Sequence, residues 1–396
     1  MSKPKVVILG GSYAGLMAAS RLARQQVADV VLLDQSPYFE QRIRYHQVLA
    51  GASVPRGPLA HWLRPAGVSF AHAAVTTLEP EKRRLLTTAG PIDYDFLIVT
   101  TGSRIDSSSI PGAPEHSHSL NSQNQCQTLA PSIQQLAQTG GRLLLVGGGL
   151  TQLETATELA NRHPSLHITL LSSHNPFKNF APKAEQYFRN HLQQARITLL
   201  EDHRVLEVQQ GVCRTSQGAL PFDLCLCAPG FKASPIVNRI TDQLDDNGRA
   251  KVTDTLQLTD DDRIWIAGDS AAFPWQGPSP LRMGCAVALP MGAQAGENVA
   301  AVIKGNDPTP FSFGFLIRCV SLGRKAGVVQ TTQWDDKAKK RVFTGTSGAW
   351  IKERVCRMTF NIPRWELATG LRLYRWPSVP AIHQDIQRTV IDSVEG

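Results

Sequence analysis

The hydrophobic pattern at the start of the chain predicts a strand, a tight turn and a helix. Residues 6–9 are β-branched and aliphatic, which is typical of a strand buried on both faces of a parallel sheet. Residues 16–24 follow a helical spacing and are rich in alanine, and a second apolar run occupies residues 30–34. This strand, helix and strand unit indicates a parallel sheet.

The same pattern recurs later in the chain. Residues 142–146 form another apolar strand, followed by three glycines, the helical sequence LETATELA and a strand at residues 167–171. Further strand-and-glycine stretches lie at residues 94–103, 222–231 and 263–271. We therefore predict an α/β fold with two Rossmann-like dinucleotide-binding domains, and the later stretches mark where the chain crosses between them.

Beyond residue 312 this alternation stops. The segments FSFGF, GVVQTTQ and RVFTGTSG suggest a short hairpin region, and AWIKERVCRM has the spacing of an amphipathic helix. Its apolar face holds Trp350, Ile351, Val355 and Met358, whereas Lys352, Glu353, Arg354 and Arg357 lie mostly elsewhere. A small C-terminal α+β region is expected.

Length and composition indicate a soluble protein with more than one domain. The 396 residues exceed what one ordinary hydrophobic core accommodates. The apolar fraction is 42%, and no run approaches the roughly 18 apolar residues that a membrane-spanning helix needs. Because MSKPK leads directly into the first strand, no signal peptide is expected and the protein is predicted to be cytoplasmic.

The charged residues and cysteines exclude some classes of function. The net charge is +8, but Lys and Arg are scattered rather than gathered in a nucleic-acid footprint, and the excess equally suits anionic lipid or anionic cofactors. The seven cysteines begin only at Cys126 and include no CxxC, so we expect neither a disulfide framework nor a redox-active pair. Cys225 and Cys227 are interpreted as buried thiols, and no metal site is predicted.

The first glycine turn has the chemistry of a phosphate-binding loop. It reads Gly10, Gly11, Ser12, Tyr13, Ala14, Gly15. Glycine lets the backbone approach a pyrophosphate, and the following helix N-terminus offers free amides. Ser12 replaces the usual middle glycine and adds a hydroxyl. Asp34 ends the next strand 19 residues after Gly15, the usual place for an acid that binds a ribose, so a dinucleotide site is predicted.

The second glycine turn departs from this pattern. Gly147 and Gly149 keep their places, but Gln152 stands where a third small residue normally lets helix pack on strand. We expect Gln152 either to displace the helix outward or to weaken nucleotide binding. The next strand ends in SSH at residues 172–174 without an acid, and Lys178 follows, which permits a nucleotide with a 2′-phosphate.

The order of these stretches resembles flavoproteins with two dinucleotide-binding domains. This group includes type II NADH:quinone oxidoreductases, apoptosis-inducing-factor-like proteins and their pyridine nucleotide-disulfide reductase relatives, and the resemblance covers roughly residues 4–304. RIRYHQVLAG and FGFLIRCVSLGRKAGVVQ look like a bacterial branch called NADH dehydrogenase-like. The resemblance implies an FAD-binding domain in two parts, residues 1–106 and 236–312, an NAD(P)H-binding domain at 107–235 and an interface or membrane-facing region at 313–396.

The resemblance assigns FAD to the first turn. Its glycines would approach the pyrophosphate, Asp34 the adenosine ribose, and Asp269 the ribityl chain or pyrophosphate region, although a turn aspartate has the same appearance. A helix at residues 289–303, with Pro290 in its first turn, would aim its N-terminus at the flavin pyrimidine ring. The residues assigned to FAD are Gly10, Gly11, Ser12, Ala14, Gly15, Asp34, Arg42, Thr101 and Gly102 on the adenine side, Gly268, Asp269, Leu289 and Pro290.

The resemblance likewise assigns Gly147, Gly149 and Thr151 to NADH or NADPH, and Glu154 matches a helix glutamate that often faces the nicotinamide. His46 lies where disulfide reductases of this fold carry a cysteine pair. With an ordinary pKa near neutrality, His46 is a candidate proton donor to a substrate at the flavin, and a histidine with only structural hydrogen bonds is the alternative.

The predicted function is an FAD-dependent oxidoreductase that takes a hydride from NAD(P)H and passes electrons to a quinone-like or other small acceptor. The stretch CAVALPMG at residues 285–292 lacks the glutamines that usually face the quinone in type II dehydrogenases, so Ala286 and Met291 would suit a smaller, more apolar acceptor, unless Met291 only fills the core. The alternatives are a flavoenzyme of specialised metabolism that acts directly on an organic substrate, and a flavin-bearing binding or signalling protein.

The C-terminal region also leaves alternatives open. In type II dehydrogenases such a region rests on the membrane, which would give this protein a peripheral position on the inner face of the membrane. A homodimer contact or packing within the chain predicts the same amphipathic pattern. No nucleic-acid partner is expected.

Overall fold

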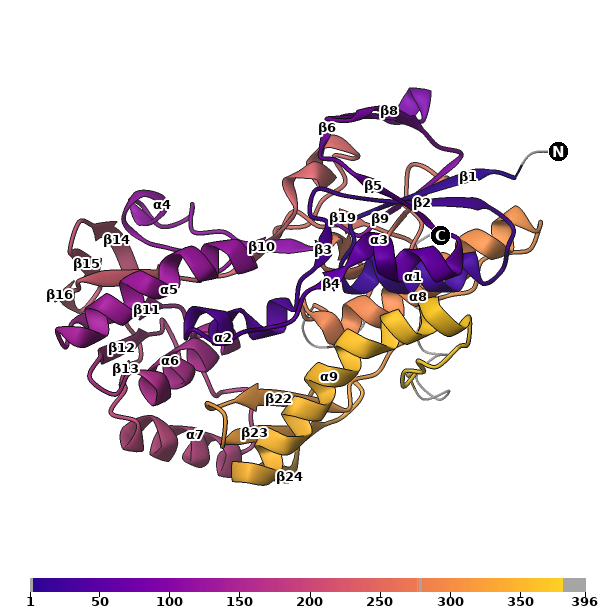
Figure 1. Ribbon diagram of the computed structural model, residues 1–396. Helices are drawn as coiled ribbons and strands as arrows, with labels where there is room; N and C mark the ends of the chain where they lie inside the picture. The colour runs from indigo at the N-terminus through magenta and orange to yellow at the C-terminus, as the bar shows by residue number, and fades with distance from the viewer. Residues whose placement is uncertain (1–2, 276, 278–279, 380–396) are drawn as a thin grey trace, which may run out of the picture.

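The first of two parallel sheets takes its strands from distant parts of the chain. The computed structural model describes residues 3–275, 277 and 280–379, and Figure 1 shows their arrangement. The strands of the first sheet are β1 (Lys5–Leu9), β2 (Asp29–Asp34), β5 (Ser69–His72), β9 (Phe96–Val99) and β20 (Ile264–Ile266). Their order is β20-β9-β1-β2-β5, so residues 264–266 complete a sheet begun by the first hundred residues.

The second sheet repeats this construction. It consists of β11 (Arg142–Val146), β12 (His167–Leu171), β13 (Thr198–Leu200) and β17 (Leu224–Cys227), in the order β13-β12-β11-β17 and all parallel. Its helices are α5 (Gln123–Gln138), α6 (Leu150–Arg162) and α7 (Pro182–Gln194). Cys225 and Cys227 are buried together in one apolar cluster, as predicted. Both sheets therefore lie where the hydrophobic pattern places them.

Two short strands join the segments that cross between the sheets. β10 (Ser103–Ile105) and β18 (Phe231–Ala233) pair antiparallel, each just after a predicted strand-and-glycine stretch. The predicted boundaries near residues 106 and 235 fall close to these strands and stay predictions.

Small elements decorate the two sheets. The strands are β3 (Tyr38–Phe39), β4 (Gly57–Pro58), β6 (Val75–Glu79), β7 (Arg84–Thr87), β8 (Gly90–Asp93), β14 (Val205–Gln209), β15 (Val212–Thr215), β16 (Gly218–Pro221), β19 (Ala250–Lys251) and β21 (Ala271–Ala272). The short helices are α2 (Tyr45–Leu49), α3 (Leu59–Leu63), α4 (Ala113–His116) and the 3₁₀ turns η1 (Arg42–Arg44), η2 (Arg64–Ala66), η3 (Pro80–Lys82), η4 (Pro235–Arg239) and η5 (Gly268–Ser270).

The C-terminal region is larger than the predicted hairpin. β22 (Ile317–Ser321), β23 (Gly327–Thr332) and β24 (Ala338–Thr344) form a three-stranded antiparallel sheet. Helix α9 (Gly345–Thr369) follows and continues through Pro363. In Figure 1, α9 runs in yellow from this sheet towards the side of the molecule that holds the first parallel sheet. Trp350 and Met358 are exposed, whereas Ile351 and Val355 are half-buried, so only part of the predicted apolar face is open.

Helices α1 (Tyr13–Ala23) and α8 (Cys285–Ile303) touch through their backbones. A Cβ on Gly292 would lie 2.0 Å from the carbonyl oxygen of Ala14, and one on Gly296 would lie 2.5 Å from that of Ala18. Only glycine fits at both contacts. The two glycines are one helical turn apart, a spacing that the sequence displays but that gains meaning only once the partner helix is known.

The start of α8 corrects the predicted helix at residues 289–303. The helix begins at Cys285, so Pro290 lies in its second turn rather than its first. In the second turn, the proline removes the hydrogen bond to the carbonyl of Ala286. Ala286 is exposed, so water can satisfy that carbonyl. The first four residues of the helix are therefore those that sequence reasoning left outside it.

A buried arginine ties α9 to both of these helices. Arg21, on α1, is fully buried and binds Glu366 of α9 at 2.7 Å and Glu297 of α8 at 2.8 Å. Its Nη2 also donates to the carbonyl of Tyr374 at 2.7 Å. Because breaking a buried ion pair leaves an uncompensated charge, this cluster fixes α9 as part of the fold.

The close approach of α1 and α8 gives a direct test. Gly292→Ala adds a methyl group where the backbone of Ala14 already lies, so the helices must separate. We expect a loss of roughly 1–3 kcal/mol in the free energy of unfolding, measured by denaturant titration. Ala286→Ser adds one atom on the exposed side of the same helix and should change stability by less than about 0.5 kcal/mol. Equal stability of the two variants would contradict the backbone contact.

Candidate functional site

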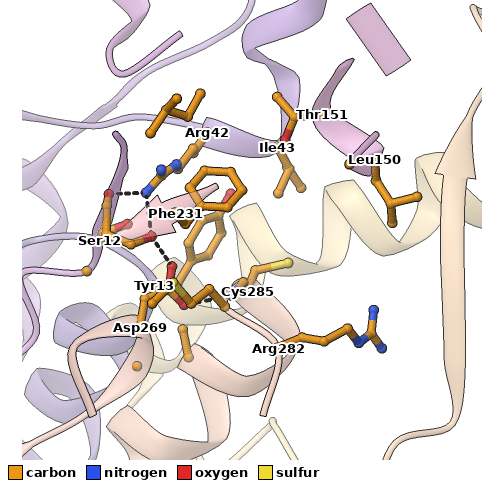
Figure 2. Close-up of a pocket in the computed structure, with 18 of the residues that line it drawn as sticks. Ser12, Tyr13, Arg42, Ile43, Leu150, Thr151, Phe231, Asp269, Arg282 and Cys285 are labelled. Atoms are coloured by element: carbon orange, nitrogen blue, oxygen red, sulfur yellow. Dashed lines mark hydrogen bonds between the residues drawn. The ribbon is translucent and has the colours of Figure 1, made fainter. Parts of the chain in front are cut away.

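Two adjoining cavities flank the first glycine turn. The larger has a volume of about 630 Å³ and the smaller about 280 Å³, and both are lined by Ser12 and Thr100. Figure 2 shows the larger cavity in close-up. A pair of cavities joined at a glycine turn suits an elongated ligand with its middle at the turn.

The first turn is closely fitted to the strand beside it. Gly10 has φ +111°, and a Cβ there would lie 2.6 Å from the carbonyl oxygen of Thr100. Asp34 lines the smaller cavity, and its carboxylate accepts hydrogen bonds from the backbone N–H of Gly11 at 2.5 Å and of Ser36 at 2.7 Å. Burial raises the pKa of Asp34, and these two backbone donors partly offset that effect. The acid therefore lies beside the cavity where a ribose hydroxyl is predicted.

Three helices begin at the wall of the larger cavity. The first residues of α1, α6 and α8, namely Tyr13, Leu150 and Cys285, all line it. Among the described residues, no N-cap side chain accepts a hydrogen bond from the first turn of any of the three. Free amides and three positive dipole ends converge here, which favours a ligand with several negative charges.

Asp269 and Arg42 form a linked pair on this wall. Asp269, in η5, accepts hydrogen bonds from the N–H of Gly284 at 2.6 Å and from the hydroxyl of Ser103 at 2.7 Å. Arg42 donates to the carbonyl of Ser103, and its guanidinium lies 4.9 Å from the ring centre of Phe231 (Figure 2). The buried Nη2 of Arg42 has no hydrogen-bond partner among the described residues. A buried donor without a partner is costly, so this atom marks a place for an acceptor on a ligand.

The second turn forms the opposite wall. Gly147 has φ +125°, and a Cβ there would lie 2.2 Å from the carbonyl oxygen of Ala228. Gly149 and Thr151 line the larger cavity. Gln152 is buried, and its amide donates to the carbonyls of Val146 at 3.1 Å and Leu226 at 2.8 Å. Gln152 thus points inward, towards the ends of β11 and β17, and does not line the cavity. Its long side chain reaches two carbonyls that a small residue at this position could not reach.

A group of ionisable side chains lies between these walls. Lys352 of α9 forms an ion pair with Glu154 of α6 at 3.0 Å, and Glu154 also accepts the backbone N–H of Ser321 at 2.9 Å. Burial disfavours both charges, but each charge stabilises the other. The pKa of Glu154 is therefore lowered, and that of Lys352 is raised well above its ordinary value. All three of Lys352, Glu154 and His46 line the larger cavity.

His46 is not a third charge in this group. Its Nδ1 lies 3.8 Å from the Glu154 carboxylate, a distance at which a charged imidazole would form an ion pair. Burial, however, lowers the pKa of His46 to about 4, and Glu154 only partly opposes this effect. His46 is therefore neutral near pH 7, and the contact is a dipolar one.

Most of the predicted site residues come together, with some exceptions. Predicted residues that line the larger cavity are Ser12, Ala14, Arg42, His46, Gly102, Gly149, Thr151, Glu154, Gly268 and Asp269, and those that line the smaller are Gly10, Ser12, Asp34 and Thr101. Gly11, Gly15 and Gly147 lie in the turns behind these walls. Leu289 and Pro290 line neither cavity, because α8 begins four residues earlier and presents Gly284, Cys285 and Ala288 instead.

The structure also moves residues that sequence reasoning assigned elsewhere. Met291 is buried in the core and Ala286 is exposed, and neither lines either cavity, so neither position faces an acceptor there. Lys352 and Ser103 were not predicted for the site. No local pattern marks them, since Lys352 looks like one of several charged residues on an amphipathic helix.

A family model described as pyridine nucleotide-disulphide oxidoreductase matches residues 4–294. An NADH dehydrogenase-like protein of Mycobacterium tuberculosis is 29% identical over 360 residues, which is 84% of this chain and 89% of the relative. A type II NADH:quinone oxidoreductase of Staphylococcus aureus is 23% identical over 374 residues, 86% of this chain and 93% of the relative.

Two solved structures share the fold at low identity. The sulfide:quinone oxidoreductase of Aquifex aeolicus superimposes with a TM-score of 0.78 at 17% identity, over 97% of this chain and 94% of the other. NDH2 of Plasmodium falciparum in complex with NADH also has a TM-score of 0.78, at 12% identity, over 96% of this chain and 100% of the other. At these identities the likeness concerns the fold.

The buried neutral His46 predicts how stability depends on pH. Its pKa falls from 6.5 to about 4 on folding, so between these values the unfolded chain binds a proton that the folded chain does not. Stability is lost as pH falls through this window. His46→Gln should remove on the order of 2 kcal/mol of the difference in unfolding free energy between pH 7.5 and pH 5. His116→Gln, on exposed α4, is the control, and an unchanged pH slope in His46→Gln would contradict the neutral imidazole.

Proposed function

Because the chain belongs to the pyridine nucleotide-disulphide oxidoreductase family, we propose that it is an FAD-dependent enzyme that takes a hydride from NAD(P)H and passes electrons to a quinone-like acceptor. Family membership confirms the predicted fold class, the oxidoreductase class and the pairing of FAD with a nicotinamide nucleotide. The acceptor, the roles of individual residues and the membrane contact are proposals.

One observation carries this function: a single cavity is lined by both glycine turns. A dinucleotide on each turn would bring the two reactive ends into that cavity. The residues fit FAD, because the uncapped start of α1 lines the larger cavity and the buried Nη2 of Arg42 has no hydrogen-bond partner among the described residues. Bound FAD supplies the two-electron chemistry between nucleotide and acceptor.

The proposed FAD site follows the two cavities in order. Asp34 would hold the adenosine ribose in the smaller cavity, and the amides at the start of α1 would face the pyrophosphate. Arg42, Ser103 and Asp269 would hold the groups that follow. Gly284 and Cys285 at the start of α8 would face the far end of the flavin, where the dipole favours negative charge.

We assign to Lys352 the stabilisation of negative charge on the acceptor. Reducing a quinone carbonyl places negative charge on its oxygen before water protonates it, and the Lys352 ammonium lies at the cavity with its charge maintained by Glu154. His46 is neutral near pH 7, so we assign it a hydrogen-bonding role instead. The Staphylococcus relative is named for a quinone, which supports this acceptor class.

The outer face of α9 supports a peripheral membrane contact. On α9, Trp350 is 62% exposed and Trp365 is 50% exposed. The Arg354 guanidinium lies 5.1 Å from the ring centre of Trp350. Aromatic side chains beside cations are typical of a helix that rests in the interface of an anionic bilayer. Within the described part of the chain, none of the helices combines the length and apolar composition needed to cross a membrane.

The proposed chemistry is tested by anaerobic spectra of the purified protein. NADH or NADPH should bleach the flavin band, and a short-chain quinone should restore it. Lys352→Met should slow the restoring step by at least about tenfold while leaving the bleaching step within about threefold, because the ammonium stabilises charge that develops on the quinone only in the second step. Lys340→Met, on exposed β24, is the matched control.

Lys352→Met also leaves the Glu154 carboxylate without its ion-pair partner, so a double variant with Glu154→Gln separates this effect from the loss of the ammonium. A normal rate of flavin reoxidation in both variants would contradict the role of Lys352. If neither nucleotide bleaches the flavin, the direct-substrate flavoenzyme becomes the better reading.

The membrane contact is tested with vesicles. Deleting α9 is unsuitable, because the helix supplies Glu366 and Lys352 to the fold and the site. Trp350→Ser with Trp365→Ser should instead weaken binding to anionic vesicles by about tenfold or more in a sedimentation assay. Leu206→Ser, at a 52% exposed leucine on β14, is the control. Unchanged vesicle binding with conversion of a dimer to a monomer would assign this face to subunit contact.

A further inference from the structure

The two glycine turns of this chain have matching strand pairs and matching backbone hydrogen bonds. In the first, Leu33 of β2 pairs with Leu9 of β1 and accepts the N–H of Gly10 at 2.8 Å. In the second, Leu171 of β12 pairs with Val146 of β11 and accepts the N–H of Gly147 at 2.9 Å. The residue after each leucine therefore occupies the same place, and that residue is Asp34 in one turn and Ser172 in the other.

The local hydrogen bonds differ in one respect that concerns a ligand. The Asp34 carboxylate reaches the N–H of Gly11, beside the cavity. The Ser172 hydroxyl donates to the carbonyl of His174 at 2.5 Å, and a Cβ on Gly148 would lie 2.1 Å from this hydroxyl oxygen. Ser172 is buried under the glycine turn and its donor is occupied, so no side chain from this position presents a negative charge to a ribose.

The surroundings of Ser172 are poor in free negative charge. Residues 172–184 contain no acid, and they include the exposed His174 and Lys178. Glu201, which follows the neighbouring strand β13, is held by Arg189 at 2.6 Å. Asp202 is exposed beside it, and Arg204 follows two residues later. Asp202 is thus the one acid among these described residues that has no ion pair or hydrogen bond of its side chain. The cations Lys178 and Arg204 outnumber it.

We propose that Ser172 sets the choice of nicotinamide nucleotide and that this chain binds NADPH at least as tightly as NADH. This inference rests on the proposed function, since it requires a nicotinamide nucleotide on the second turn. An acid at this place accepts hydrogen bonds from the ribose 2′-hydroxyl and repels a 2′-phosphate. Serine removes both effects, and the neighbouring cations favour the dianionic phosphate.

The test uses probes that carry no nicotinamide. Binding of ADP-ribose and of 2′-phospho-ADP-ribose to the FAD-loaded protein is measured by calorimetry. We expect the phosphorylated probe to bind at least as tightly in the wild type. Ser172→Asp, which copies Asp34 of the first turn, should shift the ratio of the two dissociation constants by at least about tenfold towards ADP-ribose. Gln134→Glu adds the same charge on an exposed position of α5 and should leave the ratio unchanged.

Each result decides the question. Tighter binding of ADP-ribose by tenfold or more in the wild type overturns the inference, and so does an unchanged ratio in a folded Ser172→Asp variant. If neither probe binds to the wild type, the proposed use of a nicotinamide nucleotide fails first and this inference fails with it. Thermal unfolding of Ser172→Asp checks that the variant is folded.

Discussion

The geometry of the candidate site depends on the backbone contact between α1 and α8. These helices are far apart in the chain, and glycines 292 and 296 let them approach until a Cβ would lie 2.0 and 2.5 Å from backbone oxygens of α1. The start of α8 and the start of α1 then line one cavity. Gly268 depends on the same contact, since a Cβ there would lie 3.2 Å from Ala14 and 3.4 Å from Ala288. If the two helices moved apart, Asp269 and the first turn would no longer face one ligand.

Helix α9 is held to this arrangement by buried charges at both ends. Glu366 binds Arg21 near its C-terminus, and Lys352 binds Glu154 near its N-terminus. Buried charges are stable only when paired, so each pair is a demanding constraint on where the helix lies. The opposite face of α9 carries the exposed Trp350 and Trp365. One helix thus carries both an exposed face and a side chain that lines the cavity.

What could be predicted from sequence was local in origin. Residues 6–9 and 142–146 reveal their strands because a buried strand has an apolar pattern of its own, and Asp34 is identified by its fixed distance from the glycine turn. The start of α8 was misplaced because Pro290 usually marks a first turn, whereas the helix tolerates it in the second. Lys352, Ser103 and the inward turn of Gln152 depend on partners more than 70 residues away in the chain, so no nearby pattern announces them.

The electric field within the cavity depends on which charges cancel one another. Glu154 and Lys352 form a neutral pair, His46 is uncharged near pH 7, and Asp269 lies near Arg42 through Ser103. With the side-chain charges largely balanced, the uncompensated contribution comes from the starts of α1, α6 and α8, whose first-turn amides lack side-chain caps among the described residues. Such dipoles act over about one helical turn, so they select where negative charge lies rather than how much is attracted. Two ligands with a diphosphate each can meet three such helix ends without competing for one. The proposed role of Ser172 concerns only the ligand of the second turn: with serine in the place that Asp34 takes in the first turn, no carboxylate there repels a 2′-phosphate.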